Sequence, residues 1–163
     1  MNALLSRDHA EVDVLLDNAL KKFETQDAES AFTALDFAWA RLAVHIRAEH
    51  LHLFPGALEV SRREAVPDID ETLERLRRDH DFFMHEFGSA IKSMRSMTDE
   101  TKGGIMRDAA RALLAIRDRL IEHNAIEEER IYPLCALMSE RDGDVISRFV
   151  SKELNNLPPR FSK

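Results

Sequence analysis

Two stretches of the sequence place a histidine and a glutamate four residues apart and close on a proline. They cover residues 45–55 and 123–133. Side chains four residues apart on a helix lie on the same face, with Cβ atoms about 5–6 Å apart. Each stretch therefore presents an imidazole beside a carboxylate. The pairs are His45 with Glu49 and His123 with Glu127.

A second repeated signal, Arg-Asp-His, precedes each stretch, at residues 7–9 and 78–80. The chain thus reads as two similar halves, about 1–66 and 67–140, each with a lone histidine and then a histidine–glutamate pair. Four imidazoles and two carboxylates are typical of a metal site. The predicted ligands are His9, His45, Glu49, His80, His123 and Glu127.

These residue types limit the metal. A buried carboxylate has to be paired, protonated or bound to a metal, and the alternative without a metal is a hydrogen-bonded polar core network. The single cysteine, Cys135, excludes a site built from several thiolates. Imidazole and carboxylate fit iron, manganese or zinc.

Two glutamates among four histidines favour two ions that share both carboxylates. Each ion then has two imidazoles and two bridging carboxylates, and a bridging oxygen raises the count to about five ligands, one short of octahedral. A small molecule would react at the open position.

The rest of the chain predicts helices that position these residues. The protein has 163 residues with five Gly and five Pro, 44% hydrophobic and 33% charged. Apolar residues recur at spacings of three and four, a pattern typical of helices in a bundle, in four segments that lie within residues 5–23, 31–52, 69–94 and 109–134. Short linkers make neighbouring helices antiparallel, and counting residues from the helix ends places all six ligands at a similar depth. We therefore predict an all-α, antiparallel up-down four-helix bundle.

Boundary signals complete this prediction. Asp8 or Ser6 caps the first helix, and Asp68 with Glu71 caps the third. Pro55 interrupts the second helix, and Asp142-Gly143 stops the fourth. A short extra C-terminal helix covers residues 145–154. Residues 1–155 then form a single domain, and residues 156–163 form a flexible tail.

The remaining polar side chains near the site receive other roles. His50, His85 and Glu128 are predicted to be solvated. His52 either supports a ligand or lines a channel, or is a partly exposed residue near the interruption. The aromatic residues before each proline, Phe54 and Tyr132, are predicted core residues.

The net charge of −7 disfavours binding to nucleic acid or to an acidic membrane surface. Neither a secretion signal nor an apolar segment long enough to span a membrane is present, so we expect a cytoplasmic protein.

The order of these residues, with their Leu-Phe-Pro and Ile-Tyr-Pro endings, resembles the hemerythrin-like family of HHE cation-binding domains over about residues 1–140. The resemblance implies a four-helix bundle with a non-haem di-iron centre. Oxygen-carrying hemerythrins have a second histidine four residues after the third-helix histidine, where this chain has Met84. A site of four histidines and two glutamates is instead similar to bacterial di-iron proteins of nitrosative and oxidative stress, and to hemerythrin-type iron and oxygen sensors.

We therefore expect two iron ions, with manganese or zinc as alternatives, and a small diatomic or peroxide ligand. The expected function is to bind or react with oxygen, nitric oxide or peroxide in stress response or iron handling. The alternatives are a di-iron enzyme, either a peroxidase or a nitric oxide reductase, and a sensor that acts through protein contacts. The protein partner of such a sensor is unknown.

Overall fold

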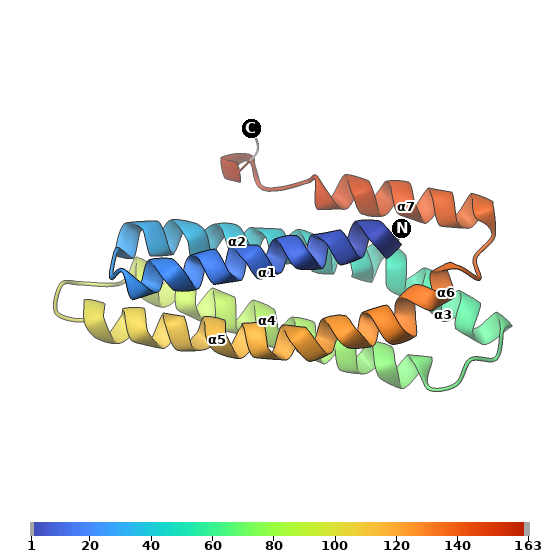
Figure 1. Ribbon diagram of the computed structural model, residues 1–163, viewed down its shortest axis with the longest axis horizontal. Helices are drawn as coiled ribbons and strands as arrows, with labels where there is room; N and C mark the ends of the chain where they lie inside the picture. The colour runs from blue at the N-terminus through green and yellow to red at the C-terminus, as the bar shows by residue number, and fades with distance from the viewer. Residues whose placement is uncertain (1, 162–163) are drawn as a thin grey trace.

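Four long helices run side by side along the length of the molecule (Figure 1) in the computed structural model, which describes residues 2–161. They are α1 (Asn2–Glu24), α2 (Ala28–Ala48), α4 (Ile69–Arg95) and α5 (Lys102–Ile126). Helices α1 and α4 each pack against both α2 and α5. No strand occurs among residues 2–161. The predicted all-α bundle is confirmed.

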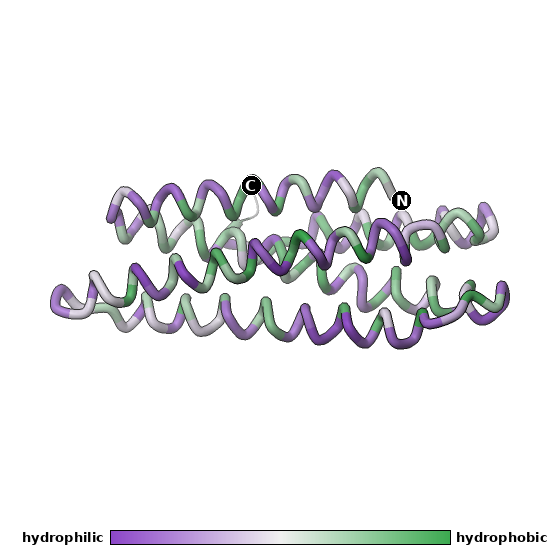
Figure 2. Tube along the Cα trace, turned by 60° about the horizontal axis from the view of Figure 1, so that its bottom comes forward, coloured by the Kyte–Doolittle hydropathy of each residue, from purple (hydrophilic) through white to green (hydrophobic). Residues whose placement is uncertain are grey.

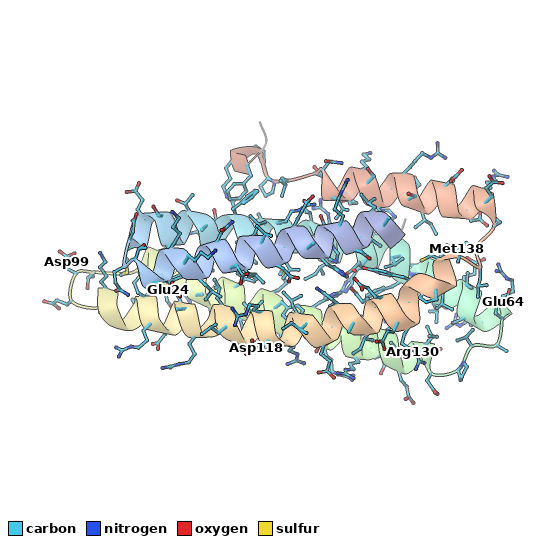
Figure 3. The ribbon with its side chains drawn as sticks, viewed as in Figure 1. Glu24, Glu64, Asp99, Asp118, Arg130 and Met138 are labelled. Atoms are coloured by element: carbon cyan, nitrogen blue, oxygen red, sulfur yellow. The ribbon has the colours of Figure 1, made fainter. Side chains whose placement is uncertain are left out.

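The apolar spacing of the sequence explains why these helices associate. In residues 5–23, for example, the side chains that recur at spacings of three and four are all buried: Leu5, His9, Val12, Leu16, Ala19 and Phe23. Hydrophobic and hydrophilic residues alternate around each helix (Figure 2). Charged side chains such as Asp99, Asp118 and Arg130 lie on the outside of the bundle (Figure 3). Burial of one apolar face per helix supplies the main stabilisation of such a bundle.

The predicted interruption at Pro55 is a π-helical turn, and the second stretch repeats it. The turns are η1 (Glu49–Leu53), followed by α3 (Phe54–Arg63), and η2 (Glu127–Ile131), followed by α6 (Tyr132–Cys135). Each begins at a predicted glutamate ligand, whose carbonyl accepts from the residue five positions later. Proline has no N–H for the carbonyl four residues before it, so a wider turn forms there.

Of the predicted helix caps, the one on α1 is wrong, whereas Asp68 occupies the N-cap position of α4 without the expected side-chain hydrogen bond. Helix α1 already begins at Asn2, so Asp8 lies inside it. Asp68 has a left-handed backbone, with φ of 63°, and its side chain makes no capping hydrogen bond. An aspartate tolerates this conformation, and its carbonyl instead accepts from the Thr72 hydroxyl at 2.7 Å.

The extra C-terminal helix is present as α7 (Glu140–Leu154), which packs on α2 and η1. It begins earlier than predicted, and Asp142-Gly143 does not stop a helix but lies in its first turn. The reason is a cap: Ser139 Oγ accepts from the Asp142 N–H at 3.1 Å. Gly56 of α3 allows close approach here, because a Cβ at this position would lie 2.7 Å from Ile146 of α7.

Part of the segment predicted as a flexible tail contacts α2. The short helix η3 (Pro159–Phe161) carries Arg160, which donates two hydrogen bonds to Asp36 at 2.9 and 3.0 Å. Residues 162–163 of that segment lie outside the described residues. Across residues 2–161, no helix is both long and apolar enough to cross a membrane.

Candidate metal centre

A polar layer divides the core of the bundle into two apolar clusters. On α1, His9 lies between Leu5 of one cluster and Val12 of the other, and the clusters also meet on the other three long helices. All six predicted ligands lie in this layer and are at most 5% exposed. The helical faces predicted from the sequence therefore converge at one depth. The role of the six residues as ligands stays a prediction.

The two carboxylates each face two histidines. Glu49 Oε1 lies 2.9 Å from His45 Nε2, and Glu49 Oε2 lies 3.2 Å from His80 Nε2. Glu127 Oε2 lies 3.2 Å from His9 Nε2, and Glu127 Oε1 lies 3.3 Å from His123 Nε2. Each glutamate therefore directs one oxygen to a histidine of the pair His9 and His45, and its other oxygen to a histidine of the pair His80 and His123. Carboxylates that bridge two ions have this arrangement.

Within this arrangement the donor atoms define two positions, each of four residues. His9, His45, Glu49 and Glu127 form the first position, which we call the His9 position. Glu49, His80, His123 and Glu127 form the second, the His80 position. The ligand atoms of each position lie within 4.8 Å of one another. Both glutamates belong to both positions, which agrees with the sharing expected from the sequence.

The chemistry of these donors fits a cation. All four glutamate oxygens are buried, and none has a hydrogen bond of acceptable geometry within the described structure, although each lies near an imidazole nitrogen. Buried polar atoms without a hydrogen bond are rare and costly. A positive ion that accepts their lone pairs removes this cost, so the residues present suit a metal centre.

Aspartates hold the outer nitrogens of the paired histidines. His45 Nδ1 lies 2.7 Å from Asp8 Oδ2, and His123 Nδ1 lies 3.3 Å from Asp79 Oδ2. When Nδ1–H donates to a carboxylate, Nε2 keeps its lone pair directed into the site. Asp8 is therefore an orienting residue and not the helix cap that we predicted.

An arginine completes each of these groups. Arg41 forms an ion pair with Asp8, and Arg119 donates to Asp79 at 2.7 Å through Nε. Each arginine lies four residues before the paired histidine. The repeat Arg-x-x-x-His-x-x-x-Glu, together with the aspartate before each lone histidine, was the sequence signal for this outer layer, and sequence reasoning missed it.

The lone histidines take their outer partners from the π turns. His9 Nδ1 lies 3.2 Å from Glu128 Oε1, and His80 Nδ1 lies 2.8 Å from His50 Nε2. We predicted that Glu128 and His50 are solvated. Both are exposed, as predicted. The prediction missed their contacts to the lone histidines because it assumed α-helical angles, and the π turn changes the direction of the residue after each glutamate.

The aromatic residues before the prolines differ between the halves. The Phe54 ring stacks on His80, with centroids 5.7 Å apart. The Tyr132 hydroxyl lies 3.0 Å from His9 Nε2. Burial raises the pKa of Tyr132, so this hydroxyl stays protonated. Both rings are core residues as predicted, but Tyr132 also brings a polar group to the centre.

The charges of the layer change several pKa values. Burial opposes protonation of His123, but Glu127, Asp79 and Glu49 together outweigh burial, and the pKa of His123 rises to about 9. Glu49 likewise raises the pKa of His45 against the effect of burial. Burial raises the pKa of Glu49, yet the adjacent His45 and His80 bring that pKa well below its ordinary value. Burial and the neighbouring His80 lower the pKa of His50.

The other two histidines lie away from the centre. His52 stacks on Phe149 of α7, with ring centroids 5.2 Å apart, which agrees with the partly exposed alternative. His85 is exposed as predicted.

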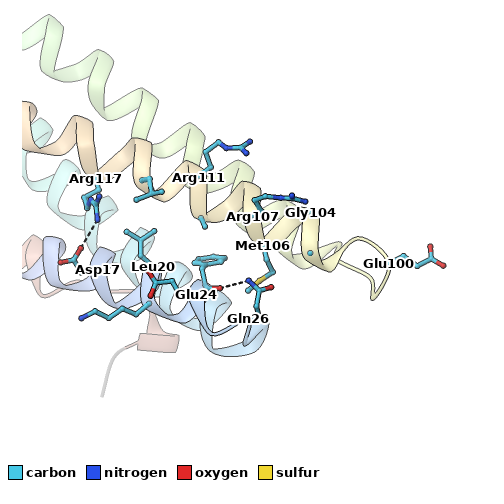
Figure 4. Close-up of a pocket in the computed structure, with 15 residues that line it drawn as sticks. Asp17, Leu20, Glu24, Gln26, Glu100, Gly104, Met106, Arg107, Arg111 and Arg117 are labelled. Atoms are coloured by element: carbon cyan, nitrogen blue, oxygen red, sulfur yellow. Dashed lines mark hydrogen bonds and ion pairs between the residues drawn. The ribbon is translucent and has the colours of Figure 1, made fainter.

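A large cavity also lies apart from the metal centre, between α1 and α5 towards the end of the bundle where α1 ends and α5 begins (Figure 4). Its volume is about 970 Å³, and none of the six predicted ligands lines it. Arginines and acidic residues line its rim, and Arg117 pairs there with Asp17 at 3.6 Å. The chemistry expected from the sequence therefore does not reside in this cavity.

Comparison with known proteins gives one match. The family model described as hemerythrin HHE cation binding domain matches residues 1–135, a range that contains all six predicted ligands and ends before α7. No curated protein and no solved structure matches the chain.

Proposed function

The chain belongs to the hemerythrin HHE cation-binding domain family, and from this premise we propose that it is a non-haem di-iron protein that binds or reacts with oxygen, nitric oxide or peroxide. The observation that carries the proposal is the placement of Glu49 and Glu127. Each directs one carboxylate oxygen to the His9 position and the other to the His80 position. Two carboxylates shared in this way suit a pair of cations better than a single one.

The donor set favours iron over zinc. Each position offers four protein ligands, which would complete the tetrahedral coordination that zinc prefers in structural sites. Iron takes up to six ligands and accepts imidazole and carboxylate, so four protein ligands leave room for a further molecule. A bound pair of iron ions would supply redox chemistry towards a small ligand. Manganese is the second candidate, and zinc the third.

The space beside the centre favours a very small ligand over a larger substrate. A cavity of about 10 Å³ is lined by three of the predicted ligands, His9, His45 and His123, by Asn124, and by the apolar residues Val12, Leu42 and Leu120. This volume suits a guest about as large as one water molecule. The apolar residues disfavour bulk water and larger substrates. As part of the same proposal, the protein acts in the cytoplasm in stress response or iron handling.

Metal analysis and an optical spectrum of the air-exposed and reduced protein test the proposal. We expect close to two iron ions per chain and an absorption spectrum that changes on reduction. A protein that holds one zinc ion and has no affinity for iron would contradict it.

Variants of the glutamates add a matched comparison. Glu49→Ala and Glu127→Ala should lose metal, because each removes a ligand from both positions. His85→Ala removes an exposed side chain and should retain both ions. Equal retention in all three variants would show that the ligand set is wrong.

A further inference from the structure

The outer partners of the two lone histidines differ in charge, and from this we infer that the His9 position binds a cation more tightly than the His80 position. This inference rests on the proposed two-ion site and names Glu128 and His50 as the positioning residues that make its halves unequal. Glu128 gives His9 an anionic partner at 3.2 Å, whereas His50 gives His80 an imidazole at 2.8 Å.

The repeat in the chain isolates this difference. Glu128 and His50 occupy the same place in the two stretches, one residue after the shared glutamate. The paired histidines have equivalent partners, because His45 has Asp8 with Arg41 and His123 has Asp79 with Arg119. Within the hydrogen-bonded layer, the exchange of a carboxylate for an imidazole is therefore the main chemical inequality.

The smaller differences do not all act in the same direction, because Arg41 beside the His9 position is 13% exposed and Arg119 beside the His80 position is 43% exposed. The Asp8 contact to His45 is 2.7 Å, whereas the Asp79 contact to His123 is 3.3 Å. On the other side, the guanidinium of Arg77 lies over the Phe54 ring, 5.7 Å from its centroid, and Phe54 stacks on His80. The positive charge of Arg77 near the His80 position is opposed by the negative charge of Asp81 on the same side, and the hydroxyl of Tyr132 near His9 carries no net charge. The outer partners of the lone histidines therefore remain the larger difference.

The physical reason is the strength of the outer hydrogen bond. When Nε2 of a histidine binds a metal, Nδ1–H donates outward, and a carboxylate acceptor makes the imidazole a stronger ligand than a neutral acceptor does. The carboxylate also adds a negative charge near the ion. Changes of such outer partners typically alter metal affinity about 10- to 100-fold. Because Glu128 is 47% exposed, solvent screening places the effect towards the lower end of that range.

Titration of the metal-free protein with cobalt(II), followed by native mass spectrometry and calorimetry, tests the inference. Two binding steps in this titration would not by themselves show that the positions differ, because the first ion repels the second even in a symmetric site. We therefore use matched variants at the two partly exposed positions. Glu128→Gln should weaken the tighter step about tenfold and leave the weaker one nearly unchanged. His50→Glu should strengthen the weaker step and bring the two affinities together.

NMR resonances of the histidines, recorded with half an equivalent of cobalt(II), identify which of the two positions binds the first ion. We expect paramagnetic shifts at His9 and His45 before His80 and His123. The inference is overturned if two ions bind but His80 and His123 shift first, or if neither variant changes the step assigned to it. Binding of one ion at saturation would instead contradict the proposed two-ion function, so the two failures are distinguishable. Circular dichroism of each variant checks that the helices are retained.

Discussion

Each predicted ligand histidine has a protein partner on its outer nitrogen, so its ring orientation is set before any metal binds. The partners are Asp8 for His45, Asp79 for His123, Glu128 for His9 and His50 for His80. The three carboxylate partners accept from Nδ1–H and so fix the tautomer that directs Nε2 inward, whereas His50 sets only the orientation of the His80 ring. The centre is therefore preorganised by residues that do not themselves face the ions.

Replacement of the aspartates should weaken metal binding. In Asp8→Asn and Asp79→Asn, the side chain keeps its size but loses its charge, and its amide can donate to Nδ1 and favour the wrong tautomer. We expect about 10- to 100-fold lower affinity for cobalt(II) in each variant, measured by calorimetry. Asp118→Asn is the control because Asp118 is 71% exposed. Unchanged affinity in both aspartate variants would show that these contacts do not orient the ligands.

The raised pKa of His123 predicts that metal binding releases protons. In the metal-free protein this pKa is about 9, compared with 6.5 for an unperturbed imidazole, so His123 is protonated at pH 7. A metal ligates only the neutral imidazole. Apparent affinity should therefore rise with pH up to about pH 9. Calorimetry at pH 7 in buffers of different ionisation enthalpy measures the protons released, and a value of zero would contradict the prediction.

The raised pKa of His123 also makes the free energy of unfolding of the metal-free protein depend on pH, and this dependence runs opposite to that of metal affinity. Because the folded pKa of His123 exceeds the unfolded value, its contribution to stability is fully present below about pH 6.5. That contribution is lost as pH rises through about 9. The metal-free protein should thus become less stable over the pH range in which it binds metal more strongly.

At the scale of the helices, the two π turns place the glutamates. Each turn begins at a glutamate and ends just before the residue that precedes a proline. Since Pro55 and Pro133 lack an N–H, the carbonyls of Leu51 and Glu129 have no α-helical donor. The helix is therefore weakest directly beside the centre.

Metal removal should loosen these turns first. Without ions, two carboxylates and four imidazoles face one another in a buried layer, and water entry would reduce the cost. Hydrogen exchange of the metal-bound and metal-free forms should show lost protection across residues 45–60 and 123–136. Unchanged protection there would indicate a bundle that is stable without its metal.

At the scale of the whole molecule, α7 lies outside the range matched by the family model. It is nevertheless connected to the polar layer through an arginine of α2. Arg41, which pairs with Asp8, also donates to the carbonyl of Leu154 at 2.6 Å. A second contact joins Arg47 to Glu153 at 2.6 Å. Helix α7 therefore supports the arginine that holds the partner of His45.

The packing of α7 should contribute measurably to stability. Leu154 is 3% exposed, so Leu154→Ala should lower the free energy of unfolding of the metal-free protein by about 2–5 kcal/mol, the range for buried leucines. Leu51→Ala is the control, since Leu51 is 56% exposed, and it should change stability by less than about 0.5 kcal/mol. Urea denaturation measures both. Equal effects would mean that α7 is only loosely attached.

The sequence alone determined the helical architecture and which six side chains meet. Helix periodicity is a local property, so residues such as His9 and His80 on apolar faces could be assigned to the core before any contact was known. The interruption at Pro55 was equally local. Asp68 occupies the predicted start of α4, although its side chain makes no capping hydrogen bond. The stop at Asp142-Gly143 failed because Ser139 caps α7 just before it.

Only the tertiary structure decided the partners of those six residues. Asp8 and His45 are 37 residues apart, and His9 and Glu128 are 119 apart. Such contacts depend on the rotation and depth of one helix against another, which local spacing does not specify. The π turns add to this, because one wider turn redirects His50 and Glu128 towards the neighbouring helices. The inequality of the two metal positions therefore emerges from packing, although each residue that produces it is visible in the sequence.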